Sequence, residues 1–227
     1  MPTLPDPREV VARGYDQIAE RYAAWVRDDV FDTVVPRYLG QLIELLPAGG
    51  TVLDLGCGGG ERLAHLARHF TTTGVDISPQ QVKRAHCTVP DARVVQGDMT
   101  RLDFPPASLD AVTAFYAFTH LPHGELPGLL VRIAHWLRPS GVLVASMGTT
   151  LNTGAYMLDW LGAPSYFSGY DTTTNRLLVE QAGFHILSAR QETIRETLDG
   201  RSSDAEFFWV VARRVDTVSA PDTAWLG

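Results

Sequence analysis

Glycines and carboxylates cluster in one short stretch of the chain, and their spacing indicates a ligand site. Glycines occupy positions 56 and 58–60, between an apolar run at 52–55 and a predicted helix at 61–70. Glycine lets the backbone turn sharply and approach a ligand with no Cβ in the way, and the following helix offers free N–H groups. The stretch therefore predicts a nucleotide-like cofactor at a strand-to-helix turn.

The spacing of these glycines differs from the dinucleotide fingerprint Gly-x-Gly-x-x-Gly. Counted from Gly56 the third glycine would be Glu61, and counted from Gly58 it would be Leu63. The third glycine lets the helix pack closely while its N-terminus faces a pyrophosphate, which a carboxylate there would repel. With Asp54 before the turn, the pattern favours a ligand that has a positive group and no phosphate.

Two more carboxylates follow the next predicted strands. Asp76 lies at the end of the run 72–77, and Asp98 follows the run 92–96. Asp76 could simply cap the next helix, but Ser78 before a proline fits that role better. Strands that alternate with helices form parallel sheets, which bind ligands at the carboxyl ends of their strands. We expect these carboxylates to share one edge of the sheet with the glycine turn.

This series of motifs resembles the class I S-adenosylmethionine-dependent methyltransferases over about residues 15–213. The resemblance implies S-adenosylmethionine as cofactor and S-adenosylhomocysteine as product. It implies that the first motif lines the methionine part of the cofactor, with Asp54, Gly56, Cys57, Gly58 and Gly60. It also implies contacts to ribose and adenine and to the cofactor's ammonium: Asp76 to both ribose hydroxyls, Ile77, Gly97, Asp98 and Met99 around adenine, and the Phe115 carbonyl to the ammonium.

The N-terminal segment resembles the lid helix of small-molecule members of this family. In those members a tyrosine hydroxyl reaches the cofactor carboxylate, so Tyr15 and Tyr22 are candidates here. They are seven residues apart and share one helix face. Packing of both rings into the core is an equally good interpretation.

His120, just after the predicted strand 109–115, is the candidate general base. Methyl transfer to an amine, phenol or acid can require that a proton leaves, and histidine is suited to accept it near neutral pH. A histidine bonded to backbone in a turn would give the same sequence. His120 and His123 have no cysteine or carboxylate at ligand spacing, so we expect no metal.

Aromatic residues gather after the fourth and fifth predicted strands. They predict a pocket for a small apolar or aromatic acceptor, although each ring alone could belong to the core. The candidates are Tyr116, Phe118, Tyr156, Trp160, Tyr166 and Tyr170.

Composition limits the partners. The 227 residues include 26 acidic and 19 basic side chains, and this net charge of −7 argues against nucleic acid or an anionic membrane as partner. Two cysteines and the lack of a signal-peptide pattern or long apolar run favour the cytoplasm. We expect a small-molecule acceptor and a monomer or homodimer.

Strands that alternate with helices predict an α/β fold. The resemblance implies a Rossmann-like seven-stranded sheet of order 3-2-1-4-5-7-6 with strand 7 antiparallel, helices on both faces and an N-terminal helical cap. One methyltransferase domain, 1–227, would comprise a cap or lid (9–46), a cofactor-binding core (51–147), an irregular substrate-side insertion (148–171), and a C-terminal helix and hairpin (172–214). The predicted helices are 9–27, 31–46, 61–70, 79–87, 125–137 and 175–183. The predicted strands are 52–55, 72–77, 92–96, 109–115, 142–147, 184–196 and 206–213, with a turn at 199–200 and a loose tail from 216.

The sequence thus predicts transfer of a methyl group from S-adenosylmethionine to oxygen or nitrogen of a small metabolite, and we expect this reaction to belong to specialised metabolism. One alternative is a protein that binds S-adenosylmethionine without transferring methyl, for example a cyclisation catalyst. A nicotinamide-dependent oxidoreductase ranks third because of Glu61 and Leu63. The acceptor and the methylated atom stay open.

Overall fold

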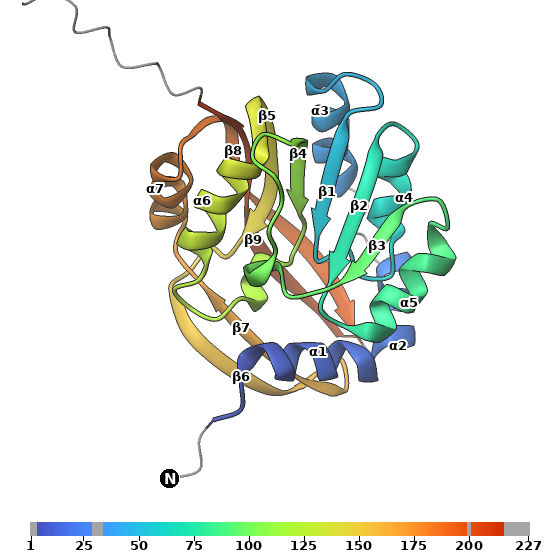
Figure 1. Ribbon diagram of the computed structural model, residues 1–227. Coiled ribbons are helices and arrows are strands. Elements are labelled where there is room, and N and C mark those ends of the chain that lie inside the picture. Colours follow the sequence, from blue (N-terminus) through green and yellow to red (C-terminus); the bar gives the residue numbers. More distant parts are fainter. Residues whose placement is uncertain (1–3, 29–33, 199–200, 216–227) are drawn as a thin grey trace, which may run out of the picture.

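The computed structural model describes residues 4–28, 34–198 and 201–215. Its centre is a seven-stranded sheet of order β3-β2-β1-β4-β5-β9-β8, as predicted apart from the strand numbering (Figure 1). Neighbouring strands from β3 to β5 are parallel, while β9 runs antiparallel to both β5 and β8. The strands are β1 Thr51–Leu55, β2 Thr71–Asp76, β3 Arg93–Gln96, β4 Leu109–Ala114, β5 Leu137–Met147, β8 Phe184–Leu198 and β9 Arg201–Arg214.

Side chains alternate between the two faces of the central strands, and both faces are buried. Leu53 and Leu55 of β1 belong to the core shared with helices α6 and α7, whereas Val52 belongs to the core shared with α3. The helices are α1 Pro7–Gln17, α2 Ala19–Asp28, α3 Val35–Leu45, α4 Glu61–Ala67, α5 Pro79–Thr88, α6 Leu126–Trp136 and α7 Thr172–Gln181. Burial on both faces explains the continuous apolar runs in the sequence.

Helices α1 and α2 replace the single helix predicted over 9–27. Helix α1 ends at Gln17, and Ile18 is buried against Leu161 and Ala163. A Cβ at Gly14 would lie 2.2 Å from the carbonyl oxygen of Pro164. Glycine at this position therefore allows α1 to approach the segment that contains Pro164 this closely. Figure 1 shows α1 crossing below the carboxyl ends of the strands.

The insertion 148–171 is regular, not irregular as predicted. It forms an antiparallel hairpin of β6 Asn152–Trp160 and β7 Ala163–Gly169. The two turn residues, Leu161 and Gly162, have φ of 57° and 92°, as a primed two-residue turn requires. Leu161 adopts a left-handed conformation that leucine rarely takes, so the residue types at this position did not predict the turn.

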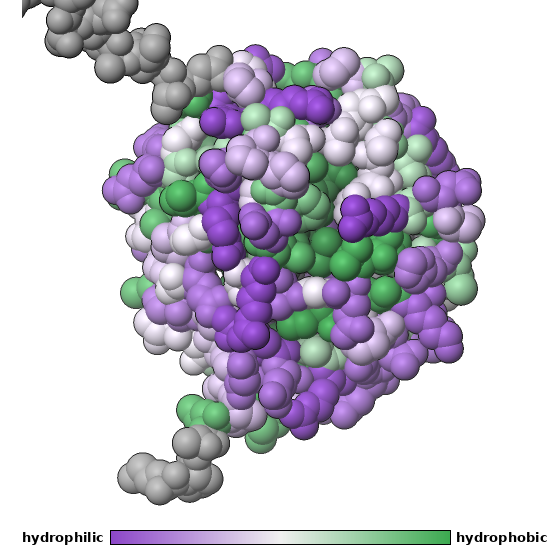
Figure 2. Space-filling view, viewed as in Figure 1, coloured by the Kyte–Doolittle hydropathy of each residue, from purple (hydrophilic) through white to green (hydrophobic). Residues whose placement is uncertain are grey.

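Two short 3-10 helices lie near the strand ends, at Met99–Arg101 and Phe118–His120. The predicted turn at 199–200 and the tail from 216 lie outside the described residues. The division of the chain into cap, core and insertion stays a prediction. On the face seen in Figure 2, hydrophilic side chains surround smaller hydrophobic areas. Within the described ranges, no helix has the length and apolar content that crossing a membrane requires.

Candidate functional site

A narrow crevice of about 60 Å³ lies where the predicted cofactor motifs converge at the carboxyl edge of the sheet. Eight predicted cofactor residues line it: Tyr15, Tyr22, Gly56, Gly58, Asp76, Ile77, Met99 and Phe115. Gly97 and Asp98 line a smaller adjoining cavity of about 40 Å³, together with Asp76, Ile77 and Met99. The structure therefore brings the three strand-end motifs and the N-terminal tyrosines together.

Glycine is required at the first turn of the crevice. Gly56 has φ of 73°, and a Cβ there would lie 2.5 Å from the Cβ of Ala117. Gly58, with φ of 55°, donates its backbone N–H to Asp76 at 2.9 Å. Both residues hold the backbone close to the crevice in a conformation that other residues rarely adopt.

Asp76 is the buried carboxylate of the crevice, and two backbone donors hold it in place. Its Oδ2 accepts from Gly58 and its Oδ1 accepts from the Ser78 N–H, both at 2.9 Å. Burial raises the pKa of Asp76 to about 6, although these hydrogen bonds oppose the shift. Each carboxylate oxygen has a further lone-pair site, so the group can also accept from ligand hydroxyls.

Three predicted cofactor residues stand behind the crevice wall. Asp54 accepts a hydrogen bond of 2.7 Å from the Thr113 hydroxyl, and burial raises its pKa to about 6. The Cys57 side chain is buried in the small core beneath α4 and α5. Gly60, with φ of 91°, starts α4 and lies under Ala85 of α5. These residues support the turn; none of them lines the crevice.

Asp98 is paired with the N-terminal segment. Its Oδ2 lies 2.9 Å from Nε of Arg8, and its Oδ1 caps the following 3-10 helix by accepting from the Thr100 N–H. Arg8 also pairs with Glu125. Helix α1 is thus tied to the wall that contains Asp98, and its residues Val11 and Tyr15 line the crevice.

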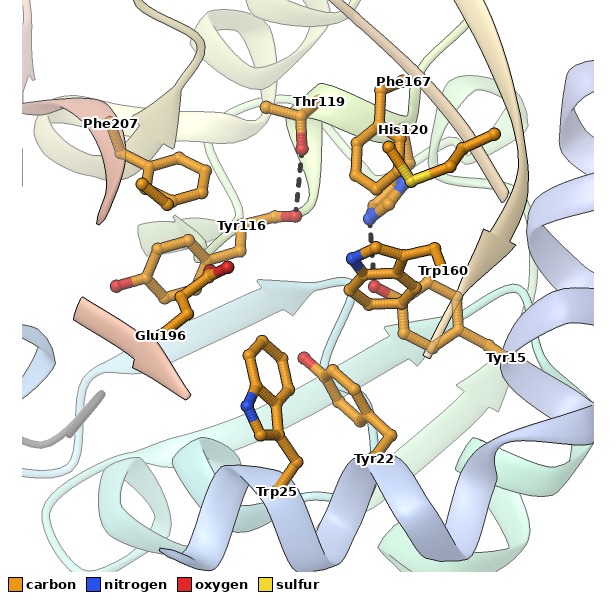
Figure 3. Close-up of a pocket in the computed structure, with 12 residues that line it drawn as sticks. Tyr15, Tyr22, Trp25, Tyr116, Thr119, His120, Trp160, Phe167, Glu196 and Phe207 are labelled. Carbon is orange, nitrogen blue, oxygen red and sulfur yellow. Dashed lines mark hydrogen bonds between the residues drawn. The ribbon is translucent and has the colours of Figure 1, made fainter. Parts of the chain in front are cut away.

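A larger cavity of about 330 Å³ adjoins the crevice (Figure 3). Its walls come from α1, α2, the 3-10 helix after β4, and the β6–β7 and β8–β9 hairpins. They are mostly aromatic: Tyr15, Tyr22, Trp25, Tyr116, Thr119, His120, Met157, Trp160, Phe167, Glu196, Ala205 and Phe207. A cavity of this size and lining suits a small apolar or aromatic molecule.

The crevice and the cavity share four wall residues, Tyr15, Tyr22, Tyr116 and His120. Tyr116 has φ of 59°, a strained conformation for an aromatic residue, and its N–H donates to the Ser146 hydroxyl at 2.6 Å. The strained turn places the Tyr116 ring between the two spaces. A group on a ligand in the cavity could therefore meet a ligand in the crevice at this shared wall.

His120 is fixed at both ring nitrogens. Nδ1 lies 2.9 Å from the carbonyl oxygen of Tyr166 and must donate, because a carbonyl only accepts. Nε2 lies 2.9 Å from the Tyr15 hydroxyl and, in the neutral ring, accepts from it. Burial lowers the pKa of His120 to about 4, although the bond to Tyr166 opposes the shift. The ring is therefore neutral at neutral pH.

Of the aromatic residues expected at the acceptor, only Tyr116 and Trp160 line the cavity. Tyr166 is buried within the hairpin, Tyr156 donates to the Pro5 carbonyl, and Tyr170 lies against His123 with ring centroids 4.7 Å apart. Phe118 is part of the main core. Alternation along β6 and β7 directs Tyr156 and Tyr166 to the face opposite Met157 and Phe167, and a register irregularity between Met157 and Trp160 brings Trp160 to the cavity side.

Sequence reasoning did not identify seven cavity residues, namely Trp25, Thr119, Met157, Phe167, Glu196, Ala205 and Phe207. It also missed Arg62, whose guanidinium lies 5.2 Å from the centre of the Tyr116 ring and forms a hydrogen bond with Tyr22. Recognising the β6–β7 hairpin from its turn would have indicated Met157 and Phe167. In the described part of the chain, no group of three or more histidine, cysteine or carboxylate side chains could hold a metal ion.

Residues 52–141 match the family model described as "Methyltransferase domain". A 2-methyl-6-phytyl-1,4-hydroquinone methyltransferase of Synechocystis is 31% identical over 60% of this chain and 54% of its own length. A 27-O-demethylrifamycin SV methyltransferase of Amycolatopsis mediterranei is 32% identical over 62% of this chain and 58% of its own. The alignments thus span little more than half the length of these curated relatives.

Solved structures share the fold at low identity. A SAM-dependent methyltransferase from Methanosarcina mazei aligns with a TM-score of 0.66 and 17% identity, over 77% of this chain and 97% of its own. The [4+2]-cyclase SpnF aligns with a TM-score of 0.69 and 16% identity, over 93% of this chain and 97% of its own. With the family match over residues 52–141, these findings support a class I S-adenosylmethionine-dependent methyltransferase, a family whose methyl donor is S-adenosylmethionine.

Proposed function

We propose that this chain transfers a methyl group from S-adenosylmethionine to an oxygen or nitrogen atom of a small apolar or aromatic metabolite. The observation that carries this proposal is the aromatic cavity that shares four wall residues with the cofactor crevice. Two relatives are named for a hydroquinone and for a rifamycin, and both names support a small-molecule acceptor.

The residues of the crevice fit the cofactor by their chemistry. The Asp76 carboxylate, held by two backbone N–H groups, would accept from the ribose hydroxyls, and Ile77 and Met99 would pack on the adenine. Asp98 would accept from the adenine amine, and the Phe115 carbonyl would face the ammonium. When bound, S-adenosylmethionine supplies an electrophilic methyl carbon on a sulfonium. The aromatic walls exclude water and hold the acceptor in line, which is the main catalytic requirement.

The Tyr15–His120 pair provides a route for a proton that leaves the acceptor. The acceptor hydroxyl or amine would donate to the Tyr15 oxygen while Tyr15 passes its own proton to Nε2 of His120. Nδ1 keeps its proton on the Tyr166 carbonyl, which holds the ring in the tautomer that this transfer needs. His120 would thus accept the proton through Tyr15.

The test is a product assay with purified protein, S-adenosylmethionine and a panel of phenols, hydroquinones and amines. We expect S-adenosylhomocysteine and a methylated product to form in equal amounts. His120→Ala and Tyr15→Phe should each lower turnover at saturating cofactor about tenfold, roughly 1.4 kcal/mol of barrier. Near-normal turnover in His120→Ala would remove the proton route.

The same assay addresses a protein that binds the cofactor without using its methyl group. The likeness to a cyclase is one of fold alone, so it assigns no chemistry to this chain. Cofactor binding with no S-adenosylhomocysteine across the whole panel would refute methyl transfer as proposed.

A further inference from the structure

The base of the β6–β7 hairpin is tied together by one buried side chain of α7. Asn175 donates from Nδ2 to the carbonyl oxygens of Gly148 and Tyr170, both at 2.9 Å, and is fully buried. These two residues flank the hairpin, Gly148 directly after β5 and Tyr170 directly after β7. We propose that Asn175 is a positioning residue of the acceptor site, because it holds the hairpin that forms one wall of the cavity. The inference rests on the proposed function, since it concerns the same cavity.

The sequence of α7 indicates that the amide is present for these two bonds. The buried residues of the helix are Asn175 and Val179, which are four residues apart and share one face. An apolar side chain is usual at such a position, and asparagine is a poor helix former because its side chain competes for backbone hydrogen bonds. Oδ1 of Asn175 is buried with no hydrogen-bond partner among the described residues, which costs free energy. The two bonds from Nδ2 offset this cost.

The two legs of the hairpin meet at glycines. A Cβ at Gly148 would lie 3.5 Å from Cα of Gly169, and a Cβ at Gly169 would lie 3.5 Å from Cα of Gly148. Neither residue has a side chain that could fix the base of the hairpin by packing. The bonds from Asn175 restrain the backbone where such packing is missing.

Strand β7 in turn fixes the segment that carries His120. The Ser168 hydroxyl donates to the carbonyl oxygen of Leu121 at 2.6 Å, and the Tyr166 carbonyl accepts from Nδ1 of His120 at 2.9 Å. A shift of β7 would therefore turn the imidazole ring and disturb the tautomer that the proton route needs. Asn175 acts on this route through β7, since it lines neither the cavity nor the crevice.

The same hairpin supplies aromatic walls of the acceptor cavity. Figure 3 shows Trp160 and Phe167 beside His120. The Phe167 ring centroid lies 4.7 Å from that of His120 and 5.7 Å from that of Trp160. A hairpin with a loose base would let these rings separate, and an acceptor would then bind to a less preorganised wall. The cofactor motifs belong to the central sheet, so cofactor affinity should change much less.

Asn175→Leu and Asn175→Asp test the inference, because both variants nearly keep the size of the side chain and remove the two donors. The first readout is hydrogen–deuterium exchange of the unliganded protein, followed by mass spectrometry. We expect the amides within 152–169 to exchange at least about tenfold faster in both variants, while the amides of β1 and β4 keep the wild-type rate.

Val179→Ala is the matched control, because Val179 is fully buried on the same face of α7 and packs in the main core. It weakens the packing of α7 and keeps the bonds from Nδ2, so the exchange of 152–169 should stay at the wild-type rate. Unchanged hairpin exchange in both Asn175 variants would overturn the inference. An equal acceleration in Val179→Ala would overturn it too.

The second readout is kinetic and uses the phenol, hydroquinone or amine of the product assay that the wild-type protein methylates. In both Asn175 variants the KM for this acceptor should rise at least about tenfold, while the affinity for S-adenosylhomocysteine, measured by calorimetry, should change less than about threefold. An unchanged KM beside a loosened hairpin would also overturn the inference. Absence of product with every acceptor in the wild-type protein would count against the proposed function alone, because the exchange experiment tests the role of Asn175 without turnover.

Discussion

The cofactor crevice and the acceptor cavity share a wall but are built in different ways. The crevice is built on the turns at the ends of β1, β2, β3 and β4, where glycines and a carboxylate held by N–H groups line the space together with residues of α1 and α2. The cavity consists of side chains from α1, α2 and two hairpins that are far apart in sequence. Substitutions should therefore separate the two: backbone changes should affect the cofactor, and side-chain truncations should affect the acceptor.

The largest expected effect is that of Gly56→Ala. The new Cβ would have to avoid Ala117 at 2.5 Å in a backbone conformation that disfavours alanine. We expect cofactor affinity to fall about 100-fold, roughly 3 kcal/mol, and the free energy of unfolding to fall by about 2–4 kcal/mol. Titration calorimetry and urea unfolding measure the two quantities.

Gly49→Ala is the control that separates backbone strain, which both variants share, from the steric clash, which only Gly56→Ala creates. Gly49 has a similar φ of 76°, but nothing lies within 4 Å of its Cβ position. It should cost about 1 kcal/mol of stability and leave cofactor affinity unchanged. Equal cofactor affinity in the two variants would show that the Gly56 turn does not shape the crevice.

Asp76→Asn should lower cofactor affinity about 10- to 100-fold at pH 7.5, because the amide keeps one acceptor and places a donor against a backbone N–H. The wild-type affinity should also fall as the pH drops below about 6, where the carboxylate takes up a proton. The variant should lose most of this dependence. Asp110→Asn is the control, because Asp110 lies near the start of β4, accepts from the Thr51 N–H and does not line the crevice.

The same pKa shift predicts a trend in stability. Between pH about 4 and 6 the folded chain holds more protons at Asp76 than the unfolded chain, because its pKa is raised from 3.8 to about 6. This group's contribution to the free energy of unfolding is therefore present below that window and lost as the pH rises through it. Urea unfolding of Asp76→Asn across this window should show a weaker fall.

The crevice was predictable because its determinants are local. Gly56 and Met99 follow strands, and Asp76 ends one; the apolar runs of these strands are visible in the sequence, and a parallel sheet brings their ends to one edge. Asp54 and Cys57 lie in the same motif yet stand behind the wall. The spacing of the glycines identifies the turn but does not show which side chains point into the crevice.

At the cavity, Trp160→Ala should weaken binding of the acceptor and not of the cofactor, the reverse of what we expect for Gly56→Ala. The indole packs against Tyr15 with ring centroids 5.5 Å apart and lines the cavity without reaching the crevice. We expect the KM for the acceptor to rise about tenfold while cofactor affinity is retained. Leu158→Ala on the same strand is the control, since Leu158 is 86% exposed. A parallel loss of cofactor affinity would show that the two spaces are not separate.

The cavity was only partly predictable because its walls depend on tertiary packing. Trp160 and Tyr116 were expected from their types alone, whereas Phe207 and Glu196 belong to strands with no motif. Their approach to the site follows from the length of the β8–β9 hairpin, which continues past the pairing of β9 with β5. Sequence periodicity indicates that such a hairpin exists but does not show what its far end covers.

The smallest expected effect concerns the N-terminal helix. Arg8 pairs with Asp98 at 2.9 Å and holds α1 against a crevice of only about 60 Å³. If Asp98 accepts from the adenine amine, cofactor binding has to weaken this pair, so Arg8→Ala should raise cofactor affinity about two- to fivefold, at most about 1 kcal/mol. Arg13→Ala is the control, because Arg13 pairs with the exposed Glu9 on the same helix. A loss of affinity in Arg8→Ala would instead make Arg8 part of the bound state, with α1 closing over the cofactor through that pair.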